Sequence, residues 1–132
     1  YHTHHNYFPL SANGLKSDFG GHDNRHHDNV YYVSTSCVGV CAQKPGHTDA
    51  FYNNTCLINS AAPEYASFNP GIGGDAWPEM HDNRVYTLDG NASESGGSIA
   101  SWQAQGVDVG TTIARMPPDD AIIAMGRAVL QM

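Results

Sequence analysis

The sequence predicts an all-β solenoid of short strands that is closed by a C-terminal α-helix. Three features indicate this fold: a short motif recurs along residues 1–90, an apolar or aromatic segment follows every copy, and an amphipathic segment ends the chain. The asparagines at the centre of successive copies are 23, 25 and 29 residues apart. Helix-pair repeats are longer, at roughly 33 to 47 residues, whereas these units are short and rich in Asn, Gly, Thr and aromatic residues.

Each copy of the motif places three side chains in fixed columns. Asparagine tolerates the left-handed backbone and hydrogen-bonds locally, so it suits a bend between two short strands. We expect the asparagines of the third column to stack at one corner and to bond through their amides as a structural ladder. The three columns hold His4, His27, Tyr52 and His81; His5, Asp28, Asn53 and Asp82; and Asn6, Asn29, Asn54 and Asn83.

The strand expected after each bend is a short apolar or aromatic segment. The segments between units are expected to be loops that leave the coil at one corner. The four short segments are residues 7–8, 30–32, 56–58 and 85–86.

The last quarter of the chain has a different pattern. Residues 98–102 are expected to form one more strand and residues 106–112 a turn. Pro117, Pro118 and the acids after them predict a helix start, since proline and acids are favoured in a first turn. The following apolar positions share one face, so we expect this helix to cap an open-ended solenoid. The chain is then one domain, with coils over 1–97 and the last strand, turn and helix over 98–132.

The charge balance excludes two classes of partner. The chain of 132 residues carries 6 Lys and Arg against 13 Asp and Glu, a formal charge of −7. Nucleic acids and anionic membrane surfaces favour clustered Lys and Arg, so neither is expected as a partner. No apolar run approaches the roughly 18 residues of a membrane helix.

The cysteines and two sequons predict an extracellular location. Two Asn-X-Ser/Thr sequons begin at Asn53 and Asn91 and are candidate glycosylation sites. The repeat places Cys56 on the coil next to Cys37 and Cys41, so we expect a disulfide between Cys56 and one of these two. Disulfides persist in oxidising compartments, which is consistent with secretion.

The motif His4-His5-Asn6-Tyr7-Phe8 resembles the His-Asn-Tyr-Phe turns of right-handed parallel β-helix proteins of the pectate-lyase-like superfamily. The resemblance covers roughly residues 1–90, and it implies a short right-handed parallel β-helix. Active members mostly act on acidic polysaccharides: lyases pair calcium-binding acids with an Arg or Lys base, and hydrolases use clustered aspartates. Their substrate groove lies away from the asparagine corner, so the histidines of the first column are not expected to be catalytic.

Candidate substrate-binding residues come from the turns before two of the bends. His22 and His47 occupy equivalent places in the two best-matched units, each near an acid. Such pairs are candidates for proton transfer or ion binding, although solvated turn residues explain them as well. The other candidates are the cations Lys16, Arg25 and Lys44, which could hold a uronate carboxylate, and Trp77, which could stack on a sugar ring.

We expect no resident metal, although calcium is possible. His2, His4 and His27 could share a transition metal across neighbouring strands, but stacking along the repeat explains these histidines without one. No 12-residue calcium loop is present. The acids that could supply oxygen ligands to calcium are Asp75, Glu79, Asp108, Asp119 and Asp120.

Two hypotheses for function follow. In the first, the chain is the C-terminal portion of an extracellular β-helix protein that binds or cleaves a polysaccharide, and coils upstream of Tyr1 complete the groove. In the second, it is a structural subunit without catalysis, whose uncapped N-terminal coil pairs with another chain in a self-assembling solenoid.

Overall fold

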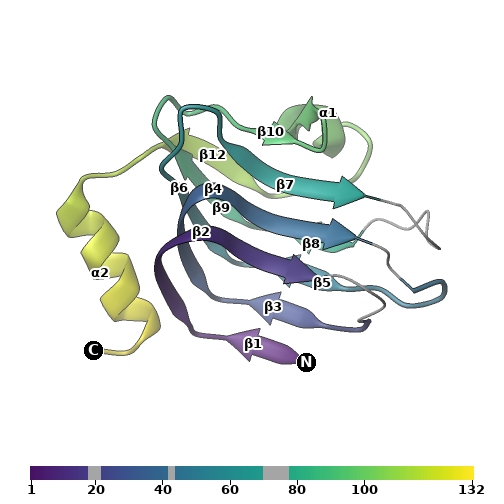
Figure 1. Ribbon diagram of the computed structural model, residues 1–132, viewed down its shortest axis with the longest axis horizontal. Coiled ribbons are helices and arrows are strands. Elements are labelled where there is room, and N and C mark those ends of the chain that lie inside the picture. Colours follow the sequence, from purple (N-terminus) through teal and green to yellow (C-terminus); the bar gives the residue numbers. More distant parts are fainter. Residues whose placement is uncertain (18–21, 42–43, 70–77) are drawn as a thin grey trace.

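The computed structural model describes residues 1–17, 22–41, 44–69 and 78–132. Within these residues the strands form two sheets (Figure 1). The smaller sheet has four short parallel strands, which are hydrogen-bonded in the order β1-β3-β5-β8. These strands are β1 (His2–His4), β3 (Arg25–His27), β5 (Ala50–Tyr52) and β8 (Glu79–His81).

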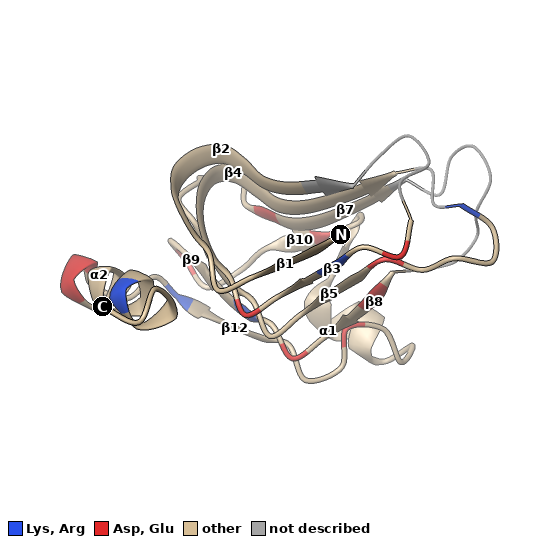
Figure 2. Cartoon of the chain, turned by 90° about the horizontal axis from the view of Figure 1, so that it is seen from below, with Lys and Arg blue, Asp and Glu red and all other residues tan. Residues whose placement is uncertain are grey.

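The larger sheet is strongly curved and is built around one long strand, β4 (Val30–Cys41). On one side β4 pairs with β2 (Tyr7–Ser17) along most of its length. On the other side its first part pairs with β6 (Thr55–Ile58) and its second part with β7 (Glu64–Asn69). Figure 2 shows β2 and β4 bending over the smaller sheet. The remaining strands are β9 (Arg84–Thr87), β10 (Ser93–Glu94), β11 (Gly97–Ser98) and β12 (Thr112–Arg115).

The prediction of a short right-handed parallel β-helix is wrong. The strands form a curled half-barrel and a small parallel sheet, and they do not make a stack of equivalent coils. The reason lies in unequal strand lengths: β2 and β4 have 11 and 12 residues, whereas β6 and β9, which follow the later bends, have only 4. The motif recurs at the bends, but it does not specify the length of the strand that follows.

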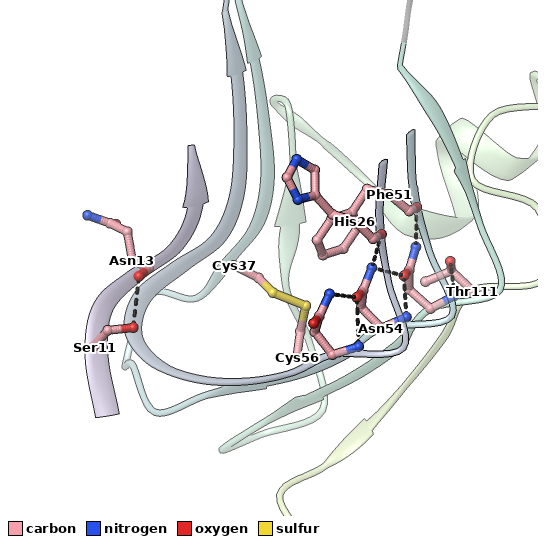
Figure 3. Close-up of a disulfide and its surroundings, with 10 residues drawn as sticks. Ser11, Asn13, His26, Cys37, Phe51, Asn54, Cys56 and Thr111 are labelled. Atoms are coloured by element: carbon pink, nitrogen blue, oxygen red, sulfur yellow. Dashed lines mark hydrogen bonds between the residues drawn. A yellow bond between two sulfur atoms is a disulfide. The ribbon is translucent and has the colours of Figure 1, made fainter. Parts of the chain in front are cut away.

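The asparagines of the motif form a continuous hydrogen-bonded row between the two sheets. Figure 3 shows Asn54 within this row. The Nδ2 atoms of Asn6, Asn29 and Asn54 each donate to the Oδ1 atom of the next asparagine, at 3.0, 3.1 and 3.4 Å. The row ends at Thr111, whose Oγ1 accepts from the Asn83 backbone nitrogen at 2.9 Å. The residue before each asparagine has a positive φ of 53° to 55°, and these residues are His5, Asp28, Asn53 and Asp82.

A disulfide crosses the interior beside this row (Figure 3). It joins Cys37 on β4 to Cys56 on β6, with the two Cα atoms 5.9 Å apart. Both cysteines are fully buried, and they pack among the largest side chains of the core. The remaining cysteine, Cys41, is half-buried at the end of β4. The large core residues are Tyr31, Val33, Val38, Phe51, Ile58, Tyr65 and Val85.

The expected strand over residues 98–102 is replaced by a short helix, α1 (Ile99–Gln103). Ser98 and Ser101 form a capping box: the Ser98 hydroxyl accepts from the Ser101 backbone nitrogen, and the Ser101 hydroxyl accepts from the Ser98 backbone nitrogen. This pair satisfies the first free N–H groups of a helix, which favours helix over strand here.

The second helix, α2 (Asp119–Val129), starts directly after Pro118, as the sequence predicts. It does not cap the end of a solenoid. It lies beside the bend of the larger sheet (Figure 1), where Ile122 packs with Val30 and Leu57. The close contact of Gly126 with the Tyr7 ring allows the helix to approach, because a Cβ atom there would lie 3.1 Å from the ring.

No helix in the described part of the chain is long and apolar enough to cross a membrane.

Candidate functional site

A groove of about 320 Å³ separates α2 from the bends of the strands. This volume is at the lower end of the range found for ligand pockets. The strands and helix that form it bring together residues from five separate stretches of sequence. The lining residues are His5, Asp28, Asn29, Val30, Asn53, Thr55, Arg84, Tyr86, Met125, Ala128 and Val129.

The strand side of the groove is a direct product of the repeat. Val30, Thr55 and Arg84 are the first residues of β4, β6 and β9, and they lie side by side in register. Tyr86 is two residues after Arg84 and therefore points to the same side of its strand. Each strand thus contributes one side chain at the same level of the groove.

The groove has an apolar floor and a polar rim. Val30 is buried, and Tyr86, Met125 and Val129 are half-buried in the same apolar cluster. At the rim Arg84 and Asn53 are exposed. The groove therefore offers a ligand both aromatic and aliphatic side chains and planar hydrogen-bonding groups.

The bend residues at the rim are held by local contacts. The Asp28 carboxylate Oδ2 lies 2.6 Å from Nδ1 of His27. The imidazoles of His5 and His4 meet through their Nδ1 atoms at 2.8 Å. The left-handed backbone at His5 and Asp28 turns their side chains out of the sheet toward the groove.

A second cluster lies at the opposite ends of β3 and β5, in the turns that precede them. Nδ1 of His22 and Nδ1 of His47 lie 2.8 and 2.6 Å from the same atom, Oδ2 of Asp23. The two imidazole rings are 4.0 Å apart between centroids. The hydrogen bonds from His22 and then His47 lower the pKa of Asp23 to about 2. These three groups are disposed so that they could hold a metal ion.

The structure places the predicted substrate-binding residues in different surroundings. His22 and His47 come together, and Lys44 is in the same turn, where its carbonyl oxygen accepts from the His47 backbone nitrogen at 3.0 Å. Arg25 points instead to Glu79, with Nη1 3.9 Å from Oε2. Lys16 is on β2, and Trp77 lies outside the described residues.

The first column of the motif forms a stack of rings along the smaller sheet. His4 stacks on His27, His27 on Tyr52 and Tyr52 on His81, with centroids 5.2, 5.0 and 5.0 Å apart. Because neighbouring rings cover one another's faces, the stack offers mainly ring edges to a ligand. His2, His4 and His27 are not among the groups of metal-ligating side chains that converge in the described chain.

The candidate calcium ligands lie apart from one another. Glu79 is on β8, Asp108 is buried, and Asp119 and Asp120 are exposed in the first turn of α2. Asp75 is outside the described residues. Within the described residues, no three of these acids converge as a metal site.

A buried acidic cluster beneath α1 was not predicted from the sequence. The carboxylate oxygens of Glu94, Oδ2 of Asp108 and the hydroxyl of Tyr65 are buried close to one another. Burial, and then the negative charge of Asp108, raise the pKa of Glu94 to about 8. Burial also raises the pKa of Asp108. Glu94 follows a serine in a polar stretch, so no apolar periodicity marks it as buried.

The two sequon asparagines, Asn53 and Asn91, are both exposed. Asn53 borders the groove, so a glycan attached there would lie over it. Asn91 is in a turn with Asp89, whose Oδ1 accepts from the Asn91 backbone nitrogen at 3.0 Å.

Comparisons with known proteins give no relative from which a function could be transferred. No protein-family model matches the chain, and searches of curated proteins and of solved structures found no match.

Proposed function

We propose that the chain binds a polysaccharide and holds one or two of its sugar units in the groove between α2 and the strand bends. The observation that carries this proposal is the composition of the groove, which combines Tyr86 and aliphatic side chains with planar polar groups. A sugar ring has an apolar C–H face and a rim of hydroxyl groups. It therefore requires this combination of an apolar surface and hydrogen-bonding side chains.

The polar groups at the rim match the hydroxyl groups of a sugar. The carboxylate of Asp28 accepts hydrogen bonds, the amide of Asn53 both donates and accepts, and the guanidinium of Arg84 offers several donors in one plane. Arg84 is the only Lys or Arg among the described residues that line the groove. It would also bind the carboxylate of a uronate unit.

The groove supports binding rather than cleavage. Glycoside hydrolysis generally requires two carboxyl groups, about 5 to 9.5 Å apart, on either side of the bond. Of the described residues around the groove, Asp28 alone carries a carboxylate, and His27 already contacts it. We therefore propose that the groove binds carbohydrate without cleaving it.

An extracellular location belongs to the same proposal. The disulfide between Cys37 and Cys56 is compatible with secretion. Extracellular polysaccharides would then be accessible to the groove.

Replacing Arg84 by Ala is expected to weaken glycan binding at least tenfold, because the variant loses about 1.5 to 3 kcal/mol of charge-assisted hydrogen bonding. Calorimetric titration with uronate and neutral oligosaccharides measures this loss. The protein should be made without glycosylation, since Asn53 borders the groove.

The matched control is Arg127→Ala, which removes an exposed arginine on α2 that does not line the groove. A third variant, His47→Ala, tests the turn that the sequence singles out. Equal affinities of wild type and Arg84→Ala, or a loss confined to His47→Ala, would contradict binding in the groove.

A second candidate function, self-assembly, is favoured by the open sheet edges at the N-terminal end. Among the strands that the structure describes, β1 pairs with β3 alone and β2 with β4 alone. Such edges offer backbone groups to another chain. We propose, as the alternative, that a second copy pairs along these two strands.

Assembly through this edge is expected to give elongated particles whose size grows with protein concentration in sedimentation and electron microscopy. The variant Ala12→Lys changes an exposed residue of β2. It should block assembly, because charged side chains on an edge strand oppose pairing with another strand. A monodisperse wild type over the whole concentration range would exclude this alternative.

A further inference from the structure

We propose that His22, Asp23 and His47 form a binding site for a divalent transition metal ion, with Zn²⁺ and Cu²⁺ as the best-matched ions. The ligand atoms of the three side chains all lie within 4.8 Å of one another. The convergence is specific, because both imidazoles direct Nδ1 to the same carboxylate oxygen. A single ion placed among them would contact all three.

The donor set determines the class of ion. Two imidazole nitrogens and one carboxylate oxygen suit Zn²⁺, Cu²⁺ and Ni²⁺, whereas Ca²⁺ and Mg²⁺ prefer a shell of oxygens. Three protein ligands leave further coordination positions for water or an external ligand. The side chains are 39, 58 and 33% exposed in chain order, so an ion could enter directly from solvent.

The fold positions the three ligands before an ion arrives. His22 and His47 precede β3 and β5, whose pairing in register, Arg25 opposite Ala50, brings the two turns together. Asp23 has a φ of 55°. Its Oδ1 accepts from the Thr48 backbone nitrogen at 3.4 Å, which leaves Oδ2 facing the imidazoles.

Only a small movement is needed to admit an ion. Metal–ligand bonds of about 2.0 to 2.1 Å in a tetrahedral site separate neighbouring ligand atoms by roughly 3.3 Å. The two nitrogen–oxygen distances of 2.8 and 2.6 Å must therefore open by about half an ångström. The three side chains are exposed or half-buried, so rotation about their own bonds can supply this opening.

The site is distinct from the groove, which lies at the other ends of β3 and β5. The groove is lined by Asp28 and Asn53, which follow these strands, whereas the metal ligands precede them. A variant at one site can therefore lose its ligand without losing binding at the other site, so the two proposals can be tested separately.

The test is calorimetric titration of the whole chain, freed of metal by a chelator, with ZnCl₂ alone. Wild type is expected to bind one ion, and His47→Ala and Asp23→Asn should each weaken this binding at least tenfold, as loss of a metal ligand or its partner commonly does. Asparagine tolerates the left-handed backbone at position 23, so Asp23→Asn should keep the fold.

The matched control is His81→Ala, which removes another His–Asp pair, with Nδ1 of His81 2.8 Å from Oδ2 of Asp82. Among the described residues, no second imidazole joins this pair in a metal-ligating group. This variant should bind zinc as wild type does. Circular dichroism checks that all variants fold. The proposal is overturned if wild type shows no saturable binding, or if His81→Ala and His47→Ala lose affinity equally.

Discussion

The contribution of Glu94 to the free energy of unfolding is expected to fall as the pH rises from 4.5 to about 8, because the folded chain binds a proton at Glu94 that the unfolded chain releases. The pKa of Glu94 is raised first by burial and then by the charge of Asp108. A carboxyl whose pKa is higher in the folded state favours folding only at low pH. Its destabilising effect is complete once the pH exceeds the folded-state pKa.

The structural origin of this effect is the cluster beneath α1. Glu94 is fully buried, and the group that meets its carboxyl there is a second carboxyl, that of Asp108. Ionisation would leave a negative charge in an apolar interior beside the buried carboxyl of Asp108. The Trp102 indole donates to the Glu94 backbone oxygen at 2.6 Å, so this bond is made to the main chain of Glu94.

Replacing Glu94 by Gln removes the ionisation and keeps the shape. Near pH 8 the variant should be more stable than wild type by about 2 to 4 kcal/mol, since each unit of pKa shift corresponds to about 1.4 kcal/mol. Near pH 4 the two proteins should have similar free energies of unfolding. Urea unfolding at a series of pH values measures the free energy of unfolding of each protein.

The matched control is Glu64→Gln, which changes a half-buried glutamate on the neighbouring strand β7. Its stability relative to wild type should not show the same rise between pH 4.5 and 8. A constant difference between wild type and Glu94→Gln over this range would contradict a proton held at Glu94.

Replacing Asn29 by Ala is expected to destabilise the chain by about 1 to 3 kcal/mol, the cost of leaving buried hydrogen-bonding groups without partners. Oδ1 of Asn29 accepts from the backbone nitrogen and Nδ2 of Asn6, both at 3.0 Å. Nδ2 of Asn29 donates to the Thr3 carbonyl at 3.0 Å and to Asn54 at 3.1 Å. Alanine removes all four contacts from a site that is 1% exposed.

Two other asparagines provide the controls for this measurement by chemical denaturation. Asn91→Ala changes an exposed turn and should cost little. Asn6 is half-buried at the edge of the row, where water can replace some of the hydrogen bonds that the side chain makes. The loss of stability in Asn6→Ala should therefore be intermediate. A loss for Asn29→Ala no greater than that for Asn91→Ala would mean that the row contributes nothing to stability.

The recurring motif predicts local structure because its chemistry is local. An asparagine, preceded by a residue that accepts a left-handed backbone, forms the bend in every copy, and stacking the bends brings the four amides into one row. The start of α2 is predictable for a similar reason, since Pro118 and the acids after it act within one helical turn.

The overall architecture depends on interactions that the motif does not contain. The lengths of β2 and β4 decide that the larger sheet curls, and these lengths follow from pairing between distant strands. The helix at residues 99–103 depends on two serine hydroxyls, a signal that the apolar pattern around Trp102 obscures.

Of the two candidate sites, the repeat identifies the one that lies within neighbouring turns, whereas the groove depends on packing between distant segments. Equivalent positions in the repeat identify His22 and His47, and the turns do bring them together. The groove needs Arg84 and Tyr86 from β9 and Met125 and Val129 from α2. No spacing in the sequence relates the helix to the strands, so the groove is visible only once α2 has packed against the bend.

The most direct test of the proposed function is a nuclear magnetic resonance titration of the unglycosylated chain with the oligosaccharide that binds best in calorimetry. The backbone amides of Asn53, Arg84 and Val129, which line the groove on three sides, should show the largest chemical-shift changes. The amides of His22 and His47, at the other ends of β3 and β5, should change little. The largest changes at those two histidines, or no changes with any oligosaccharide tested, would contradict glycan binding between α2 and the strand bends.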